Sequence, residues 1–248
     1  MRVDRREGLG LLAGAAVATA WPTRAQTVAE GVHLATYRSG DADVAAVVFT
    51  PRRPGGPMAG TGLILLNGGG GTNNDLRRFY ADAVGLSDKG YVVIMPNYLG
   101  VTATPDPANR ARWRRVVTDA AAWCVSSWSV EPDRIAVMGF SRGGWLATEV
   151  ALTEPGFRAA VGVASAGDLA AGQIVQRPPV MLIYANRDPV VEPRRTRAWE
   201  RRMRNAGAPV EAVVLDTDRH VFEADQWHEI FGLADRFLRR TLGTRASR

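Results

Sequence analysis

The chain has 248 residues, of which 46% are hydrophobic and 23% are charged. That length and balance suit one soluble α/β domain with a sizeable core. A single cysteine, Cys124, excludes an intrachain disulfide, and its place on the apolar stripe of a predicted helix favours a buried structural thiol over a nucleophile. The formal charge is +6, and almost all of the basic residues are arginines. The arginines are densest over residues 194–204, in another predicted helix. Because few aromatic residues are interleaved with these arginines, we expect a solvated helix face rather than a nucleic-acid groove.

The first 25 residues have the features of an export signal. Arg5 and Arg6 stand just before an apolar stretch over residues 8–20, which is too short and too rich in glycine and alanine for a transmembrane helix. Small residues then suit a signal peptidase, so the segment resembles a twin-arginine signal with cleavage after Ala25. We expect a bacterial protein that the export machinery delivers, already folded, to the periplasm or beyond, with residues 26–248 as one domain and no stable membrane anchor. The alternative is a cytoplasmic protein with an apolar N-terminus.

From residue 32 onward, apolar runs alternate with segments of helical period, which is typical of a mostly parallel sheet covered by helices on both faces. Strands are expected, in chain order, at residues 32–37, 44–49, 63–66, 91–95, 135–138, 159–164, 180–184 and 210–215. Helices are expected at residues 74–88, 108–125, 145–152 and 194–204, followed by a closing helix with the inner stripe Trp227, Ile230, Phe231, Ala234, Phe237 and Leu238. The first two strands suggest an antiparallel pair, and Asn74 or Asp75 can cap the first helix. We predict an α/β fold with a doubly wound sheet of about eight strands and no large cap domain, since only residues 166–179 separate the sixth strand from the seventh.

The pattern around Ser141 indicates a nucleophile. Residues 139–143 have the sequence Gly-Phe-Ser-Arg-Gly, which fits G-x-S-x-G, between a predicted strand and a predicted helix. A serine on such a sharp turn holds its hydroxyl exposed, and glycines two positions either side avoid clashes with neighbouring chain. The helix start behind the serine also directs backbone N–H groups and the positive end of a dipole toward developing negative charge. The alternative is an ordinary Gly-Ser turn.

A serine nucleophile needs a base, and the chain has 3 histidines. In a doubly wound sheet, the base belongs on a loop at the carboxyl end of a strand. His220 follows the last predicted strand directly and meets this condition. His33 lies inside the first predicted strand, and His228 lies off the inner stripe of the closing helix. We therefore predict that His220 is the base and that the other two histidines lie at the surface or at a sheet edge.

The base needs an acid that orients it, and Asp188 is the best placed candidate. It lies in the turn after the seventh predicted strand, between the serine and the histidine in the chain. Asp168, one strand earlier, is the competitor, and a helix cap is the alternative role for each. Asp216 and Asp218 are too near His220 in sequence to orient it easily across the loop.

Negative charge that develops on a substrate carbonyl needs backbone N–H donors, which form an oxyanion hole. One donor is expected from Arg142, the residue after the nucleophile, and the other from Gly69 or Gly70, in the glycine run after the strand at residues 63–66. A phosphate-binding loop is the rival interpretation of that run. However, no Gly-Lys-Ser/Thr follows it, and Asn73 breaks the G-x-G-x-x-G spacing. No pair of histidines has the spacing of metal ligands, and neither a metal nor a cofactor is expected.

Two arginines stand directly beside predicted catalytic positions, Arg142 after the serine and Arg219 before the histidine. A guanidinium that points into the cleft can hold a carboxylate with two parallel hydrogen bonds. Arg219 is therefore a candidate substrate-binding residue, and so is the side chain of Arg142. The alternative is that both side chains point to solvent.

Together these motifs resemble those of the α/β-hydrolase superfamily, and of its dienelactone hydrolase-like branch, over about residues 63–242. The resemblance rests on Asn67-Gly68-Gly69-Gly70, Gly90-Tyr91-Val92-Val93, the stretch from Asp133 to Gly144, Asp188 and His220. The chain order serine, aspartate, histidine is the order that the superfamily implies. Dienelactone hydrolases proper use a cysteine nucleophile where this chain has Ser141, and many relatives have a histidine where Asn67 stands.

The sequence therefore predicts an exported serine hydrolase that cleaves small carboxylic esters or lactones through an acyl-enzyme intermediate. A small-molecule ester is the expected partner, with short-chain or negatively charged esters preferred. Two alternatives stay open: a serine peptidase of the same fold, and a non-catalytic binding protein on this scaffold.

Overall fold

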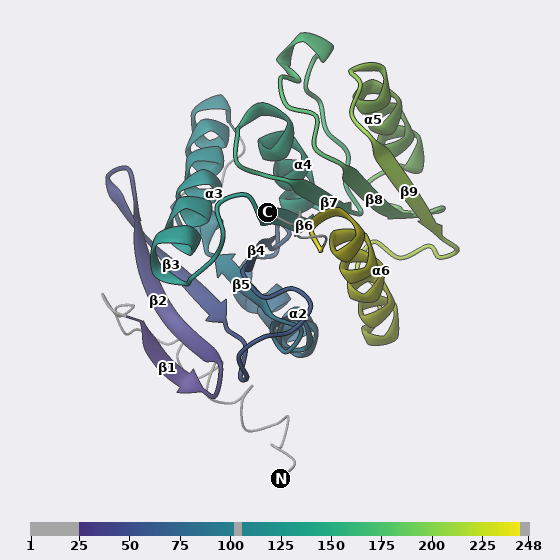
Figure 1. The fold of residues 1–248 in the computed structure, drawn as a ribbon. Coiled ribbons are helices and arrows are strands. Elements are labelled where there is room, and N and C mark those ends of the chain that lie inside the picture. The colour runs from purple at the N-terminus through teal and green to yellow at the C-terminus, as the bar shows by residue number, and fades with distance from the viewer. Residues whose placement is uncertain (1–24, 102–105, 244–248) are drawn as a thin grey trace.

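The computed structural model describes residues 25–101 and 106–243 (Figure 1). Apart from Ala25, the predicted export signal lies outside the described residues, so it stays a prediction. Within these residues, no helix is both long enough and apolar enough to cross a membrane.

The described residues form one sheet of nine strands, in the order β1-β2-β3-β5-β4-β6-β7-β8-β9. The strands are β1 (Gln26–Ala29), β2 (Val32–Ser39), β3 (Ala42–Phe49), β4 (Thr61–Leu66), β5 (Tyr91–Pro96), β6 (Ile135–Phe140), β7 (Ala159–Val163), β8 (Val180–Ala185) and β9 (Val210–Leu215). The pairings β1–β2, β2–β3 and β3–β5 are antiparallel, and all other pairings in the sheet are parallel. The mostly parallel sheet is thereby confirmed, with one strand more than expected. The additional strand, β1, escaped prediction because its four residues lie at an exposed edge and carry little apolar pattern.

Helices cover both faces of the sheet (Figure 1). They are α3 (Pro107–Ser127), α4 (Arg142–Thr153) and α5 (Pro193–Asn205) on one face, and α2 (Thr72–Ser87) and α6 (Ala224–Leu242) on the other. Each face has its own core, one around Trp113 and Trp199 and the other around Phe79 and Trp227. Because both faces are covered, every residue of strands β4 to β8 is buried, as their continuous apolar runs predicted.

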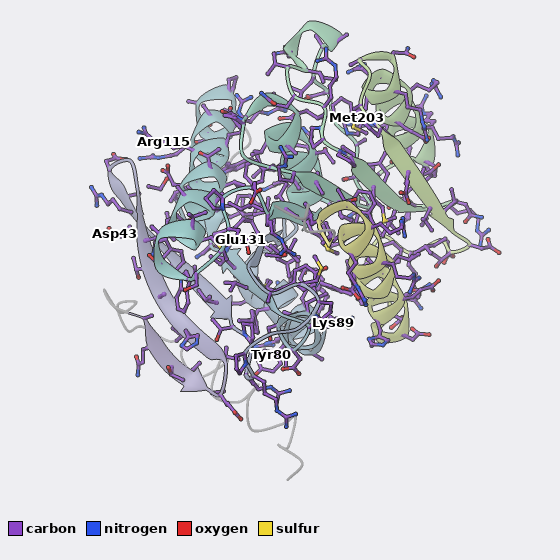
Figure 2. All side chains as sticks on the ribbon, in the orientation of Figure 1. Asp43, Tyr80, Lys89, Arg115, Glu131 and Met203 are labelled. Atoms are coloured by element: carbon purple, nitrogen blue, oxygen red, sulfur yellow. The ribbon has the colours of Figure 1, made fainter. Side chains whose placement is uncertain are left out.

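The arginine-rich segment forms α5, which has its apolar residues on one face only. Thr196, Trp199 and Met203 recur at helical spacing and are buried. The label of Met203 in Figure 2 marks the place of this helix. Most of the arginines between them are exposed. Pro193 begins the helix, where its missing N–H costs no hydrogen bond. The expected solvated arginine face is therefore confirmed.

Cys124 lies on α3 and is fully buried. Burial raises the pKa of its thiol to about 12, so the thiol stays protonated at neutral pH. This confirms the expectation of a buried structural thiol.

Two helix starts differ from the prediction. α2 begins at Thr72 after Gly71, and Asp75 lies inside the first turn instead of capping it. The Asp75 carboxylate turns back to the preceding loop, as described below. α4 begins at Arg142, three residues before the predicted start, because the N–H of Trp145 already bonds to the carbonyl of Ser141 at 3.0 Å.

Two of the loops at the carboxyl ends of the parallel strands contain a single helical turn each in the described residues. The loop between β7 and β8 holds one helical turn, η2 (Ala171–Gln173), and the loop after β5 begins with another, η1 (Tyr98–Gly100). Neither turn was predicted, since three residues carry no helical period. In an open parallel sheet this edge is where ligands bind, and the loops after β4, β6, β8 and β9 converge there.

Candidate active site

Ser141 occupies the turn between β6 and α4 in a backbone conformation that side chains rarely adopt, with φ 52° and ψ −115°. The glycines of the motif make this turn sterically feasible. A Cβ on Gly139 would lie 2.2 Å from the carbonyl oxygen of Gly143, and one on Gly143 would lie 2.4 Å from that of Asn67. The turn is therefore pressed between its own helix start and the end of β4, which fixes the place of the serine side chain.

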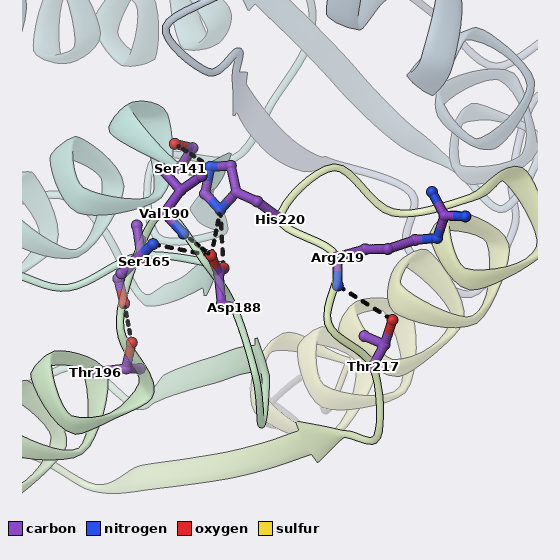
Figure 3. A network of polar contacts seen from close by, with 9 residues as sticks. Ser141, Ser165, Asp188, Val190, Thr196, Thr217, Arg219 and His220 are labelled. Atoms are coloured by element: carbon purple, nitrogen blue, oxygen red, sulfur yellow. Dashed lines mark hydrogen bonds and ion pairs between the residues drawn. The ribbon is translucent and has the colours of Figure 1, made fainter.

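Three side chains from separate loops form a continuous chain of hydrogen bonds (Figure 3). His220 Nε2 lies 2.9 Å from Ser141 Oγ, and His220 Nδ1 lies 2.8 Å from Asp188 Oδ2 and 3.1 Å from Oδ1. A carboxylate can only accept, so the proton of the neutral imidazole belongs on Nδ1, which leaves Nε2 to accept the serine hydroxyl proton. The structure thus brings together the three residues that the sequence assigned to nucleophile, base and acid, which we refer to as the triad.

The acid of the triad is held by backbone donors. Asp188 is buried, and its Oδ1 accepts the N–H of Val190 at 2.8 Å and that of Val191 at 2.9 Å. Together with the imidazole, these donors replace the water that a buried carboxylate has lost. They also fix the orientation of the carboxylate, which in turn fixes the orientation of His220.

The base of the triad is held by ring packing as well. The Phe140 ring and the His220 imidazole lie with their centroids 5.2 Å apart, and Phe140 packs in turn on Trp227 of α6, at 5.1 Å. Phe140 is also the residue before Ser141. The last residue of β6 therefore supports the histidine and also precedes the serine, which helps to keep the two side chains within hydrogen-bond distance.

The glycine run after β4 forms a tight turn, closed by a hydrogen bond from the Gly71 N–H to the Gly68 carbonyl at 3.2 Å. Gly69 and Gly70 are exposed at its tip. Among the described residues, neither of their N–H groups donates a hydrogen bond. Because β4 and β6 are neighbours and Gly143 contacts the end of β4, this turn lies next to the start of α4. The N–H groups of Gly69 and Gly70 are therefore two candidates for the one donor that the sequence predicts in this run.

Side chains from α2 and η1 hold this turn in place. The buried Asp75 carboxylate accepts the Gly68 N–H at 2.6 Å, and the Tyr98 hydroxyl donates to the Asn67 carbonyl at 2.8 Å. Thr72 Oγ1 donates to the side-chain oxygen of Asn67 at 3.0 Å. Sequence reasoning missed these contacts, since an aspartate in the first turn of a helix suggests a cap and carries no sign that it bonds to the loop before it.

The two flanking arginines are placed differently. The Arg219 guanidinium forms an ion pair with Glu223 at 2.7 Å, and Figure 3 shows its side chain directed away from the triad. The Arg142 guanidinium lies beside the glycine turn, 3.5 Å from where a Cβ on Gly69 would stand, and 5.7 Å from the ring centroid of Trp113. The structure thus brings Arg142 to the candidate site and does not bring Arg219 there.

The other two histidines lie away from the triad. His33 lies in β2, in hydrogen-bond contact with Thr27 and Thr50. His228 lies on α6 with its side chain largely exposed, and it pairs with Asp82 of α2 at 2.9 Å. His228 thus lies at the surface as the sequence predicted, whereas His33 is half-buried in a strand between β1 and β3 rather than at an edge of the sheet.

The other candidate acids have partners of their own. Asp168 pairs with Arg110 at 3.2 Å, and Asp216 pairs with Arg187 and Asn186, both at 2.7 Å. Neither carboxylate is hydrogen-bonded to a member of the triad. In the part of the chain that the structure describes, no group of three or more histidine, cysteine or acidic side chains is arranged to hold a metal ion.

The strained serine turn, the acid and base on later loops and the glycine turn after a neighbouring strand define the class of α/β-hydrolases. The family model of the dienelactone hydrolase family matches residues 44–235, which is most of the chain. The chain belongs to the dienelactone hydrolase family. A search among curated proteins gives no match.

Several solved structures share this fold. A thermophilic esterase from the Planctomycetes species Thermogutta terrifontis, with propionate bound, is 17% identical, with a TM-score of 0.70 over 87% of this chain and 97% of its own. A puromycin-hydrolysing peptidase of Mycobacterium tuberculosis is 21% identical, with a TM-score of 0.67 over 89% of this chain and 41% of its own. An acylaminoacyl peptidase of Pyrococcus horikoshii is 13% identical, with a TM-score of 0.67 over 88% of this chain and 42% of its own. The chain thus spans about two fifths of the length of these peptidases, and the likeness concerns the fold.

Proposed function

We propose that this member of a hydrolase family is a serine hydrolase of small carboxylic esters or lactones. Ser141 is the nucleophile, His220 the general base and Asp188 the residue that orients and stabilises the imidazolium. The backbone N–H of Arg142 and that of Gly69 or Gly70 form the oxyanion hole. The observation that carries the proposal is the unbroken chain of hydrogen bonds from the serine hydroxyl to the buried carboxylate.

The reaction proceeds in two halves through this arrangement. His220 takes the hydroxyl proton as Ser141 Oγ attacks the carbonyl carbon, and the oxyanion hole binds the charged oxygen of the tetrahedral intermediate. The C–O bond to the alcohol then breaks, and the imidazolium gives its proton to the leaving oxygen. In the second half, water attacks the acyl-enzyme while His220 takes its proton and then returns it to Oγ. The carboxylic acid leaves and the enzyme is restored.

Two observations support small esters over peptides. The match to the Thermogutta terrifontis esterase covers nearly the whole of both chains, while the peptidases extend far beyond the matched part. The loop between β7 and β8 holds only one helical turn, which suits an open cleft. Likeness to two peptidases keeps amide hydrolysis as the second candidate.

A panel of chromogenic esters and aminoacyl anilides tests this proposal. We expect the purified protein to hydrolyse short-chain esters faster than the anilides. Ser141→Ala and His220→Ala should each reduce kcat by at least about 10⁴-fold, and the double variant should lose little more, because the residues act as a unit. His228→Ala is the matched control, and it should retain wild-type activity because His228 lies on the outside of α6.

Three outcomes of that panel count against the proposal. Ester hydrolysis that survives Ser141→Ala in a clean preparation refutes the assigned nucleophile. Equal loss in His228→Ala and His220→Ala refutes the assigned base. Preference for the anilides by a Ser141-dependent protein supports the peptidase alternative.

We also propose that the protein is exported. The support is the sequence of the first 25 residues alone, with its paired arginines, apolar stretch and small residues before the cleavage position. The mature domain then acts in the periplasm or outside the cell.

A further inference from the structure

Large apolar side chains that remain exposed are few in the described residues, and two of them adjoin the triad. The exposed set is Val175, Val190, Val214 and Val221. Val190 stands two residues after Asp188 and is 60% exposed, and Val221 directly follows His220 and is 42% exposed.

Both valines belong to well-fixed turns, so their exposure is not that of a frayed loop. The N–H of Val190 donates to Asp188 Oδ1 at 2.8 Å, and Figure 3 shows Val190 beside that carboxylate. Val221 lies between His220, which is bonded to two partners, and Phe222, which is buried against Trp227. The backbone thus holds two exposed apolar side chains at chain positions beside the acid and the base.

The path of the proton in ester hydrolysis relates these valines to one part of the substrate. His220 Nε2 gives its proton to the oxygen of the departing alcohol, so that oxygen lies within hydrogen-bond reach of the imidazole. The alcohol therefore extends over the His220 and Asp188 loops, while the carbonyl oxygen points to the glycine turn and the start of α4. Apolar surface next to the imidazole is thus placed to meet the alcohol group.

We propose that Val190 and Val221 form an apolar subsite for the leaving alcohol, and that the preferred substrates are esters of aliphatic or aryl alcohols. The inference rests on the proposed function. Contact with an alkyl or aryl group removes exposed valine surface from water, which stabilises the complex, whereas a charged or highly hydroxylated alcohol gains nothing from these side chains. Val190 and Val221 are thereby specificity-determining residues for the alcohol side of the ester.

Esters with one acyl group and different alcohols test this subsite. The substrates are methyl, butyl and phenyl acetate, and the variants are Val190→Thr, Val221→Thr and the double substitution. Threonine keeps the branched shape and the backbone donors but replaces a methyl with a hydroxyl. Each single variant should lower the ratio of kcat/KM for butyl over methyl acetate by about three- to tenfold, because a polar hydroxyl replaces one methyl that would contact the alkyl chain. Val214→Thr is the matched control, because Val214 is 50% exposed on β9 and adjoins no member of the triad in the chain, and it should leave the ratio unchanged.

The outcomes separate this inference from the proposed function. An unchanged butyl-to-methyl ratio in the double variant, with hydrolysis still abolished by Ser141→Ala, overturns the subsite and leaves the esterase intact. A change that follows acyl length instead, in acetate against butyrate esters of one alcohol, also overturns it. Hydrolysis that persists in Ser141→Ala refutes the proposed function itself. Thermal unfolding of each variant verifies that the fold is retained.

Discussion

Asp75 holds the turn that presents two of the three candidate oxyanion donors. Its buried carboxylate accepts the Gly68 N–H at 2.6 Å and contacts Arg78 at 2.5 Å. A buried carboxylate is stable only when it is hydrogen-bonded, so Asp75 strongly constrains the positions of Gly68 and Arg78. If Gly69 or Gly70 binds the developing oxyanion, Asp75 is a positioning residue that acts through the turn.

Replacement of Asp75 by alanine should affect the chemical step more than substrate binding. We expect kcat to decrease by about 10- to 100-fold and KM to change by less than about threefold, because a displaced oxyanion donor matters mainly in the transition state. Asp75→Asn should restore most of the rate, since its amide oxygen can still accept the Gly68 N–H. Steady-state kinetics on one short-chain ester measures both constants.

Asp82→Ala is the control for that experiment, because Asp82 lies on the same helix and pairs with His228 away from the turn. It should leave kcat unchanged. An Asp75→Ala protein that is folded by circular dichroism and retains the wild-type kcat contradicts the positioning role.

The triad could be assembled from sequence because the choices were few. The chain has 3 histidines that could serve as the general base, and only His220 follows a predicted strand directly. The place of Arg219 could not be predicted in the same way. Its ion pair with Glu223 is a contact between residues four apart, but that spacing alone does not distinguish this orientation from one toward the substrate. The contact of Asp75 with Gly68 was hidden for the same reason, since it depends on where the turn packs.

At the scale of elements, helix α4 begins at the candidate site and carries a buried glutamate in its interior. The helix begins behind Ser141, and Glu149 in its interior is buried and accepts the Trp145 indole N–H at 2.6 Å. Burial, followed by the hydrogen bond and charge of Asp168, raises the pKa of Glu149 to about 7. The Trp145 indole and the charge of Arg114 act in the opposite direction and are outweighed.

The raised pKa of Glu149 predicts that folding stability decreases as pH rises. In the unfolded chain this glutamate titrates near 4.5, so between about pH 4.5 and 7 the folded state keeps a proton that the unfolded state has released. The stability contributed by this group is therefore present below about pH 4.5 and is lost as pH rises through about 7. In urea unfolding experiments from pH 4 to pH 8, the free energy of unfolding of the wild type should decrease by up to about 3 kcal/mol relative to that of Glu149→Gln.

Glu154→Gln, at the end of α4, is the control for that measurement and should follow the wild-type pH dependence. Parallel curves for wild type and Glu149→Gln across the whole range contradict the prediction.

The buried strands were the most predictable elements, because a strand covered on both faces needs an unbroken apolar run. Edges and ends were less predictable. β1 is a four-residue edge strand, and the start of α2 is set by the packing of the glycine turn rather than by a capping side chain. Both features depend on packing against an adjoining segment, β2 for the edge strand and the glycine turn for the helix.

At the scale of the whole molecule, the proposed export depends on the first 25 residues. In a bacterial host with twin-arginine transport, the chain should reach the periplasm and lose its first 25 residues, and replacing both Arg5 and Arg6 with lysine should retain it in the cytoplasm. Arg2→Lys, outside the pair, is the control and should be exported normally. Mass spectrometry of the periplasmic fraction reports the cleavage, and exported protein that still begins at Met1 contradicts the proposal.

The most direct test of the account is covalent labelling with a fluorophosphonate, which reacts with serines that an adjacent base activates. Intact-mass spectrometry of the folded protein should show one adduct, and peptide mapping should place it on Ser141. Ser141→Ala should show no adduct, His220→Ala should react far more slowly, and His228→Ala should react like wild type. An adduct on another serine, or active hydrolysis with no adduct on Ser141, contradicts the central claim that Ser141, His220 and Asp188 form a catalytic unit.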